Sequence, residues 1–276
     1  MSPNRKETKS PPKDQQQHLV IDIGNTHTVI GVFKNNHLEN HWRINTKKNI
    51  TADEVILILQ GFYKFQTAKL SNISYAAIAS VVPAIQGQWK QAVSTCFSLK
   101  PFLIQAPLCS SFTIDIDVPE QTGADRLCNV LACQALGFHE AIIIDFGTAT
   151  TFDIYKDNHY KGGLICPGIY SSLLALTQKA SKLSEVELYW NDELIGKNSD
   201  DALRNGVLYG TLAQVDGLIQ YIKKTAGMSR AKVLATGGLA SLIGKRSSNI
   251  HLIEEDLTLM GLNYFITLQL ASNINV

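Results

Sequence analysis

Two short loops of the same kind occupy corresponding places in the two halves of the sequence. Each follows a run of apolar residues and begins with an aspartate that is soon followed by a glycine, and residues with hydroxyl or amide groups come next. The pattern predicts a buried strand, a tight turn and a second strand in each half. The first loop consists of Asp22, Ile23, Gly24, Asn25 and Thr26, and the second of residues 145–151, which include Asp145, Gly147 and Thr148.

These loops have the chemistry of a phosphate-binding site. Glycine lets backbone N–H groups approach a ligand closely, and the polar side chains add donors. The aspartate that leaves each strand is placed to hold a metal ion or the water around it. Asp22 and Asp145 could instead be plain turn residues, since aspartate is common in turns. We favour the functional interpretation, because an ionised carboxylate at the end of an apolar strand is costly unless a cation or several donors meet it. Two such loops facing each other predict phosphoryl transfer from ATP.

The order of the predicted elements repeats between the two halves. In the first half, strands are predicted at residues 18–23, 28–34, 38–44, 75–82 and 102–105, with helices from Thr51, where Glu54 completes a capping box, and at 84–97. In the second half, strands are predicted at residues 141–145, 150–155, 160–165, 232–235 and 250–253, with helices after Gly168, at 199–226, after Gly238 and at the end of the chain.

Three antiparallel strands followed by helix–strand alternation, twice over, predict an α/β fold. We expect two ribonuclease-H-like domains of duplicated βββαβαβα layout with an ATP cleft between them. Residues 1–17 are polar and lack the apolar core of a secretory signal, so a disordered tail is expected there. The N-terminal domain is expected at residues 18–118 and the C-terminal domain at 119–276.

A third glycine loop follows the predicted strand at residues 232–235. It contains Gly237 and Gly238 and opens a helix, whose free N–H groups and positive dipole end suit a ribose or a phosphate. Many strand-to-helix turns carry two glycines, so the loop alone is weak evidence. Its place after two aspartate loops favours a role in binding.

The three loops resemble the phosphate-one, phosphate-two and adenosine motifs of the actin, sugar kinase and Hsp70 superfamily. Further motifs narrow the resemblance to the type III pantothenate kinase family, and together they cover nearly the whole chain after residue 17. These motifs are Gly123-Ala124-Asp125-Arg126, the run from Asp145 to Asp153, Gly162-Gly163 with Pro167-Gly168, and Ile195-Gly196-Lys197-Asn198.

The resemblance implies an activity, cofactors and a partner. The family phosphorylates the terminal hydroxyl of pantothenate with ATP, which is the first step of coenzyme A biosynthesis. It uses Mg2+ and a monovalent cation, K+ or NH4+, and it forms a homodimer. A regulatory protein that keeps this fold and binds nucleotide without kinase activity is the alternative. The chain has no basic stripe, which favours the enzyme.

The resemblance also implies roles for individual residues. Asp22 would hold Mg2+, directly or through water, and Asp145 would hold the monovalent cation. Ser199 would bind pantothenate in place of the usual threonine, with its hydroxyl kept. Ile116 stands where family members often carry a tyrosine. The implied ATP contacts are Asp22, Ile23, Gly24, Asn25, Thr26, Thr148, Gly237 and Gly238, and the implied pantothenate contacts are Gly123, Ala124, Asp125, Arg126 and Ser199.

Asp125 is implied to be the catalytic proton acceptor. It stands at the start of a helix predicted at residues 126–136, in which Leu127, Val130, Leu131 and Leu136 are expected to face inward. A helix N-terminus stabilises a carboxylate as an anion, so Asp125 is expected to be ionised near neutral pH. A plain helix start is the alternative.

Composition limits the remaining possibilities. The net charge of +1 gives no electrostatic case for nucleic acid, and no apolar run is long enough to span a bilayer. Five cysteines without a Cys-x-x-Cys spacing predict reduced thiols and a cytoplasmic protein. The apolar face of the long helix at residues 199–226 is expected either to join two copies or to cover its own sheet.

Overall fold

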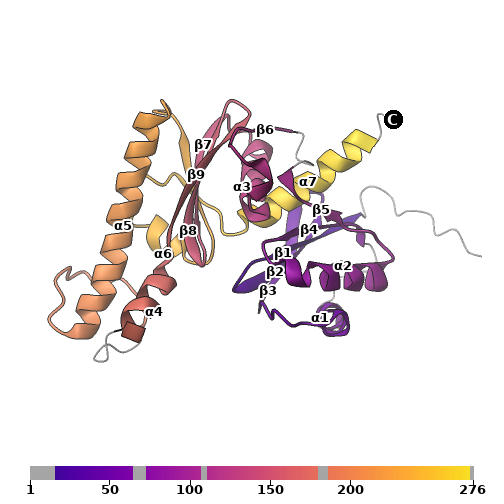
Figure 1. Ribbon diagram of the computed structural model, residues 1–276, viewed down its shortest axis with the longest axis horizontal. Coiled ribbons are helices and arrows are strands. Elements are labelled where there is room, and N and C mark those ends of the chain that lie inside the picture. The colour runs from indigo at the N-terminus through magenta and orange to yellow at the C-terminus, as the bar shows by residue number, and fades with distance from the viewer. Residues whose placement is uncertain (1–15, 65–72, 107–110, 180–185, 274–276) are drawn as a thin grey trace, which may run out of the picture. The chain divides into compact units, whose positions relative to one another are not determined.

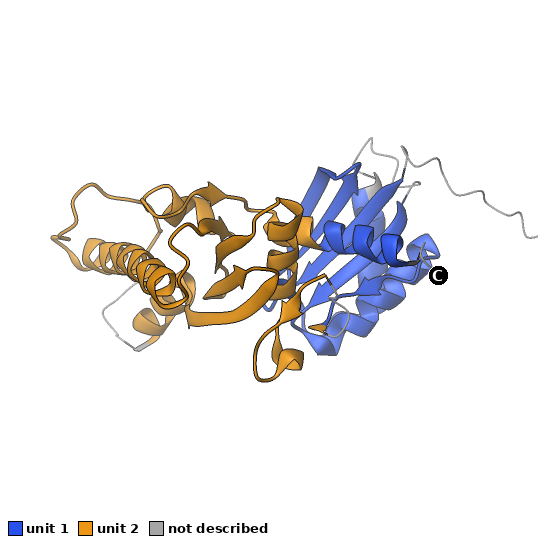
Figure 2. Cartoon of the chain, turned by 90° about the horizontal axis from the view of Figure 1, so that it is seen from above, with its two compact units in different colours: residues 1–105, 123–125, 262–276 blue, residues 106–122, 126–261 orange. Residues whose placement is uncertain are grey.

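The chain forms two compact units, which Figure 2 shows in different colours. The structure is a computed structural model that describes residues 16–64, 73–106, 111–179 and 186–273. Unit 1 comprises Met1–Gln105, Gly123–Asp125 and Leu262–Val276, and unit 2 comprises Ala106–Thr122 and Arg126–Gly261.

Unit 1 is built on a five-stranded sheet with the order β3-β2-β1-β4-β5. Strand β1 runs antiparallel to β2 and parallel to β4, and β3 is antiparallel to β2. Between β2 and β3, Asn35 and Asn36 have φ angles of 49° and 62°, the left-handed conformation that a tight hairpin turn needs and that asparagine tolerates. The elements are β1 (Gln17–Ile23), β2 (His27–Lys34), β3 (His37–Asn45), α1 (Ala52–Lys64), β4 (Ile73–Ser80), α2 (Pro83–Phe97) and β5 (Phe102–Leu103).

Helices α1 and α2 cover one face of this sheet (Figure 1). Every second residue of β1 between Leu19 and Ile23 packs into a buried cluster with Val55 of α1 and Trp89 of α2. Helix α1 starts at the predicted capping box. The Thr51 N–H donates to the Glu54 carboxylate at 2.8 Å, and the Glu54 N–H donates to Thr51 Oγ1 at 3.2 Å.

The other face of β1 carries His18, Val20 and Asp22 and meets the end of α7 (Leu257–Asn273). His18 Nδ1 lies 2.7 Å from Oδ1 of Asn263, whose Nδ2 donates to Asn36 at 3.0 Å. Burial lowers the pKa of His18, so the imidazole is neutral near pH 7 and donates its proton to Asn263. These contacts join the end of the chain to the first strand.

Unit 2 repeats the arrangement with a six-stranded sheet of order β11-β10-β7-β8-β9-β6. Strands β7, β8 and β9 are antiparallel neighbours, and β10 is parallel to β7. The turn between β8 and β9 has the same geometry as its counterpart in unit 1, with φ angles of 49° at Asp157 and 63° at Asn158. The strands are β6 (Thr113–Ile114), β7 (Glu140–Phe146), β8 (Ala149–Lys156), β9 (His159–Pro167), β10 (Lys232–Thr236) and β11 (Leu252–Ile253).

The helices of unit 2 lie on both faces of its sheet (Figure 1). Phe152 of β8 packs with Leu208 of α5 and Ile243 of α6 on one face. Its neighbour Asp153 points to the other face, where it meets Arg126 of α3. The helices are α3 (Ala124–Ala135), α4 (Ile169–Lys179), α5 (Ser199–Thr225) and α6 (Ala240–Gly244).

The apolar face predicted for the long helix covers its own unit. The apolar positions predicted for this face lie in or against the core of unit 2, which agrees with the expectation that the face covers its own sheet, and the dimer stays a prediction. Its residues are Leu203, Val207, Leu208 and Val215, which are buried, and Leu212 and Leu218, which pack against them. Within the described residues, no helix has the length and apolarity needed to cross a membrane.

The strand order confirms the predicted α/β fold with two ribonuclease-H-like units. Two short elements were not predicted: β6, and a 3-10 helix at Pro119–Gln121. Both are too short to show an apolar period. Leu136, which was predicted to face inward, is 38% exposed, because α3 ends one residue earlier at Ala135. Residues 1–15 of the predicted tail lie outside the described residues, and the domain division at residues 118 and 119 stays a prediction.

Candidate active site

The first aspartate loop is a tight connection between β1 and β2 in unit 1. Asp22 is the penultimate residue of β1 and is half-buried, and Asn25 and Thr26 at the tip are exposed. The Gly24 N–H donates to the His27 carbonyl at 3.0 Å. A Cβ at Gly24 would come within 2.9 Å of that carbonyl oxygen, so the close turn requires glycine.

Thr46, the residue that follows β3, fixes this loop through two hydrogen bonds to its carbonyls. Its hydroxyl donates to the Gly24 carbonyl at 2.8 Å, and its N–H donates to the Thr26 carbonyl at 2.8 Å. The Thr28 hydroxyl lies 2.9 Å from the Thr46 hydroxyl. Because a hydroxyl has one proton and Thr46 gives it to Gly24, Thr28 is the donor. Two carbonyls of the loop are thereby turned inward, which leaves its tip to the solvent side.

The second aspartate loop has the same position in unit 2. Asp145 is the penultimate residue of β7, half-buried, and pairs with Thr151 of β8 and Thr236 of β10. The Gly147 N–H donates to the Ala149 carbonyl at 3.0 Å, and Thr148 at the tip is exposed. The loop aspartates therefore leave equivalent strands of the two sheets.

Gly237 of the third loop packs directly against Asp145. It has a φ of 89°, and a Cβ there would overlap Oδ1 of Asp145 and the backbone of Phe146. The positive φ and the lack of room for a Cβ explain why residue 237 is a glycine. The predicted helix-dipole argument is weak, because α6 has only five residues. The structure thus brings two predicted site residues, Asp145 and Gly237, together in unit 2.

Gly168 and Ser171 support the second loop as Thr46 supports the first. Gly168 follows β9, and a Cβ there would overlap the carbonyl group of Thr148. The Ser171 hydroxyl donates to the same Thr148 carbonyl at 2.7 Å. In both units, the residue after the third strand and its neighbours fix carbonyls of the loop, those of Gly24 and Thr26 in unit 1 and that of Thr148 in unit 2.

A pocket of about 470 Å³ lies beside the third loop. The indole N–H of Trp190 donates to the Leu242 carbonyl at 2.6 Å, and the Arg246 guanidinium sits 5.3 Å from the centre of its ring. The pocket offers an aromatic face and cationic ends next to Gly238, which is suited to a base and its ribose. Its lining residues are Trp190, Gly238, Ser241, Leu242, Lys245 and Arg246.

The Gly-Ala-Asp-Arg motif forms the first turn of α3. Ala124 is buried, Asp125 lies in the first turn and is half-buried, and Arg126 reaches the sheet of unit 2. The Arg126 Nε donates to Asp153 Oδ1 at 2.5 Å, and Nη2 donates to the Phe152 carbonyl at 3.1 Å. The motif predicted Asp125 at a helix start, and the structure has it there.

Ser199 is the first residue of α5 and is exposed. Asn198 caps the helix by accepting the Asp201 N–H at 2.8 Å. A Cβ at Gly196 would overlap the backbone of Ala202, so this glycine lets the segment before α5 lie against its first turn. Lys197 is 80% exposed and pairs with Glu193 at 3.0 Å, which makes it a solvated cation.

The predicted site residues divide between the two units. Unit 1 holds Asp22, Ile23, Gly24, Asn25, Thr26, Gly123, Ala124 and Asp125, and unit 2 holds Arg126, Asp145, Thr148, Ser199, Gly237 and Gly238. The sequence did not single out Thr46, Ser171, Asp153 or Trp190 for the contacts they make. Of these four residues, only Asp153 belongs to a motif that the sequence analysis named, the run from Asp145 to Asp153.

The carboxylates of the described residues do not form a closed metal site. Nowhere in these residues do three or more His, Cys, Asp or Glu side chains gather in a way that could hold a metal ion. Asp22 is a half-buried carboxylate at the start of the first loop, and Mg2+ that is shared with a nucleotide usually takes one or two carboxylates together with phosphates and water. Asp145 offers carboxylate oxygen atoms, which are the type of ligand that hard cations prefer.

Solved structures of low sequence identity share this fold of two α/β units. The ROK hexokinase of Thermus thermophilus shares the fold with a TM-score of 0.53 and 13% identity, over 93% of this chain and 100% of that chain. A protein of Campylobacter jejuni described as a Baf family transcriptional activator shares it with a TM-score of 0.55 and 18% identity, over 94% of this chain and 100% of that one.

Sequence comparison gives the family. The model of the type III pantothenate kinase family matches residues 18–221. The type III pantothenate kinase of Halalkalibacterium halodurans is 39% identical over 245 residues, which cover 88% of this chain and 96% of the relative. The type III pantothenate kinase of Desulfosudis oleivorans is 40% identical over 246 residues, which cover 88% of this chain and 96% of that relative. The chain belongs to the type III pantothenate kinase family.

The support of the first loop by Thr46 gives a testable prediction. Thr46→Val keeps the shape of the side chain and removes the hydroxyl that fixes the Gly24 carbonyl. We expect the affinity for ATP to fall about 3- to 10-fold, because the Gly24 carbonyl is no longer fixed, and the melting temperature to fall as well, because the buried Thr28 hydroxyl loses its acceptor. Calorimetric titration with ATP measures this. Thr267→Val is the control, since its hydroxyl also donates to a carbonyl in unit 1, that of Asn263; equal losses in both variants would contradict the role of Thr46.

Proposed function

We propose that this protein transfers the γ-phosphoryl group of ATP to the terminal hydroxyl of pantothenate, which gives 4′-phosphopantothenate and starts coenzyme A biosynthesis. Membership of the kinase family supports the activity. The observation that carries the proposal in this chain is the pair of aspartate loops, each kept in a phosphate-binding shape by its own supporting residues. The alternative, a nucleotide-binding regulator without activity, is not favoured by the family to which the chain belongs.

ATP is proposed to lie against three loops. The first loop, Asp22 to Thr26, binds phosphate oxygens through its N–H groups and its side-chain donors. Thr148 adds a contact from the second loop. Gly237 and Gly238 bind the nucleoside, and the pocket beside Gly238 with Trp190 is suited to take the base by stacking. Trp190 is held by its own indole hydrogen bond, so the stacking face is fixed before the nucleotide arrives.

Asp22 and Asp145 are the proposed cation ligands. Asp22 would hold Mg2+, directly or through water, and Asp145 would hold K+ or NH4+. When bound, the two cations offset the negative charge that gathers on the transferring phosphoryl group. The packing of Gly237 on Asp145 keeps this carboxylate in one place, which a site for a weakly bound monovalent cation needs.

Pantothenate is proposed to bind at the Gly123 to Arg126 motif and at Ser199. Asp125 accepts a hydrogen bond from the substrate hydroxyl, directs its oxygen at the γ-phosphorus and takes the proton as the new bond forms. Because the transition state of phosphoryl transfer is usually loose, positioning by Asp125 contributes as much as its basicity. Ile116 lies against Gly162 in unit 2, where a Cβ would come within 3.2 Å of its Cγ2, and offers an apolar surface in place of a phenol.

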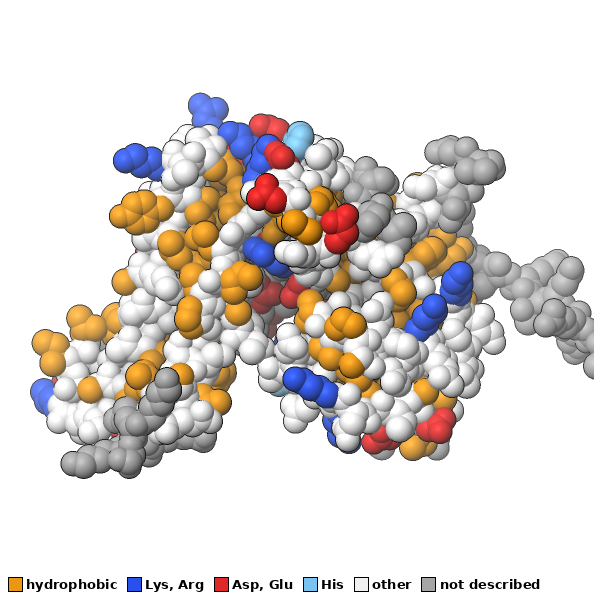
Figure 3. Space-filling model, in the orientation of Figure 1, with side chains coloured by type: hydrophobic (Ala, Val, Ile, Leu, Met, Phe, Trp, Pro, Cys, Tyr) orange, Lys and Arg blue, Asp and Glu red, His pale blue; other side chains and the backbone are white. Residues whose placement is uncertain are grey.

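The protein is proposed to work as a homodimer in the cytoplasm, without nucleic acid or membrane partners. The apolar residues proposed to meet a second copy are on β9 and α4, since the apolar face of α5 is occupied in its own unit. Figure 3 shows hydrophobic side chains on the surface of the α4 and α5 region of unit 2. The exposed residues are Leu164, Ile165, Tyr170, Leu174 and Leu176.

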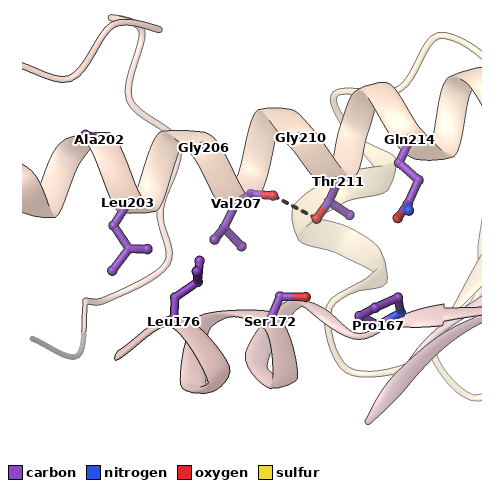
Figure 4. A pocket seen from close by; sticks show the side chains of 10 residues that line it. All are labelled: Pro167, Ser172, Leu176, Ala202, Leu203, Gly206, Val207, Gly210, Thr211 and Gln214. Carbon is purple, nitrogen blue, oxygen red and sulfur yellow. Dashed lines mark hydrogen bonds between the residues drawn. The ribbon is translucent and has the colours of Figure 1, made fainter. Parts of the chain in front are cut away.

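A groove between α4 and α5 adds to this surface. It has a volume of about 380 Å³ and is lined on one side by Ser172 and Leu176 and on the other by α5 (Figure 4). Gly206 and Gly210 add no side chains to the α5 wall, so a helix or loop of another copy can approach these two positions closely. An apolar patch with such a groove is typical of a protein–protein interface.

The activity and its cation requirement are tested together. We expect ADP release from ATP to depend on added pantothenate, to be weak in sodium buffer and to recover strongly in potassium, because Asp145 needs a monovalent cation of the right size. A coupled assay with and without pantothenate in each salt measures this. Pantothenate-independent ADP release contradicts the function, and equal rates in both salts contradict only the role of Asp145.

The role of Asp125 is tested by Asp125→Asn. The amide keeps the shape of the side chain but cannot take a proton, so kcat should fall at least about 10²-fold while ATP binding stays intact. Steady-state kinetics and calorimetry on the purified variant measure the two quantities. A kcat within a few-fold of wild type would make Asp125 a helix-capping residue only.

The dimer is tested by Leu174→Lys, which places a charge on the apolar surface of α4. We expect light scattering to give twice the chain mass for wild type and the mass of a single chain for the variant. Leu57→Lys is the control, because Leu57 is an exposed leucine of α1 in unit 1. A wild-type monomer at micromolar concentration, or an unchanged dimer in the Leu174 variant, would overturn this surface.

A further inference from the structure

A buried carboxylate lies in the sheet of unit 2 next to the start of α3. Asp153 of β8 is completely buried, and its Oδ1 accepts two hydrogen bonds, from Arg126 Nε at 2.5 Å and from the Tyr160 hydroxyl at 3.0 Å. The Arg126 guanidinium also lies 5.8 Å from the centre of the Tyr160 ring. None of these contacts is needed to form the sheet, since all of them are made by side chains.

Gly163 of β9 gives the guanidinium its space. It is the strand partner of Asp153 in the register of β8 and β9. A Cβ at this position would meet Arg126 Nη2 at 2.5 Å and would overlap the Phe152 carbonyl, which accepts a hydrogen bond from the same Nη2 at 3.1 Å. The Gly162-Gly163 motif and the Gly-Ala-Asp-Arg motif are therefore parts of one arrangement.

The buried charges of Asp153 and Arg126 allow little change in the geometry of these side chains. A buried carboxylate without a partner is costly, so Asp153 depends on Arg126 and on the Tyr160 hydroxyl. Burial, and next the charge of Asp153, raise the pKa of the Cys133 thiol of α3, which therefore stays neutral and adds no charge. The contacts with Asp153 and Phe152 use one edge of the guanidinium and fix its plane. A guanidinium carries five N–H donors, of which these two bonds use two.

We propose that Asp153 and Tyr160 are positioning residues for pantothenate: they hold the Arg126 guanidinium in the orientation in which it binds the substrate carboxylate. This inference rests on the proposed function. Pantothenate carries one carboxylate, at the end opposite to the hydroxyl that is phosphorylated. A planar guanidinium matches a carboxylate through two parallel hydrogen bonds, but only when its plane is fixed beforehand. Asp153 supplies this orientation and Tyr160 fixes Asp153.

The test uses Tyr160→Phe, which removes one hydroxyl and keeps the ring. We expect the KM for pantothenate to rise about 5- to 10-fold, with kcat and the KM for ATP within about two-fold of wild type, since one hydrogen bond to a charged group is lost. Tyr155→Phe is the matched control. Tyr155 is the buried strand partner of Tyr160, and its hydroxyl donates to Asn158 at 3.3 Å instead.

A substrate analogue separates positioning from a structural role. Pantothenol carries an alcohol in place of the carboxylate, so Tyr160→Phe should leave its KM unchanged relative to wild type. Asp153→Asn should raise the KM for pantothenate more than Tyr160→Phe does, again without an effect on the KM for ATP. The inference is overturned if Tyr160→Phe leaves the KM for pantothenate unchanged, or if it raises the KM for pantothenol and for pantothenate equally. It is also overturned if the variant loses kcat and ATP affinity together with a drop in melting temperature. Wild-type protein without pantothenate-dependent activity would instead overturn the proposed function itself.

Discussion

The tight turn at the end of the central strand of each sheet is the constraint on which the site depends. In unit 1, Thr46 holds the carbonyls of the Asp22 to Thr26 loop by hydrogen bonds. In unit 2, the corresponding support comes from the close approach of Gly168 and from the Ser171 hydroxyl. The duplicated fold thus fixes carbonyls of both loops, and it does so with different residues in each unit. The sheets are the rigid frame that makes this possible.

In phosphoryl transfer, a protein contributes mainly by positioning the reacting groups and stabilising charge, and the residues of the proposed site are suited to these two tasks. The reaction depends on fixed donors, fixed cations and the correct placement of the attacking hydroxyl. Gly237 limits the position of Asp145, and Asp153, which also accepts the Tyr160 hydroxyl, fixes the Arg126 side chain within unit 2. Preorganisation by packing and buried hydrogen bonds is therefore the main contribution of this chain to the proposed chemistry.

The sequence predicts most of the fold and the location of the site, for physical reasons. Continuous apolar runs along β1 and β7 mark buried strands, and pairs such as Asn35-Asn36 mark the hairpin turns, so local patterns suffice for the element order. Contacts between distant single residues leave no such pattern. Thr46 and Trp190 therefore escaped prediction, and Gly237 was predicted for a helix dipole that the five-residue helix α6 barely provides. The short strand β6 has no periodicity to detect.

The central claim is that this chain phosphorylates the terminal hydroxyl of pantothenate. Identification of the reaction product tests it most directly. Purified protein is incubated with ATP, Mg2+, K+ and pantothenate, and the product is examined by mass spectrometry and by phosphorus and carbon NMR. The account predicts a product heavier than pantothenate by one phosphoryl group, with the phosphorus coupled to the carbon that bears the terminal hydroxyl. Unmodified pantothenate, or phosphate at any other position, would contradict it.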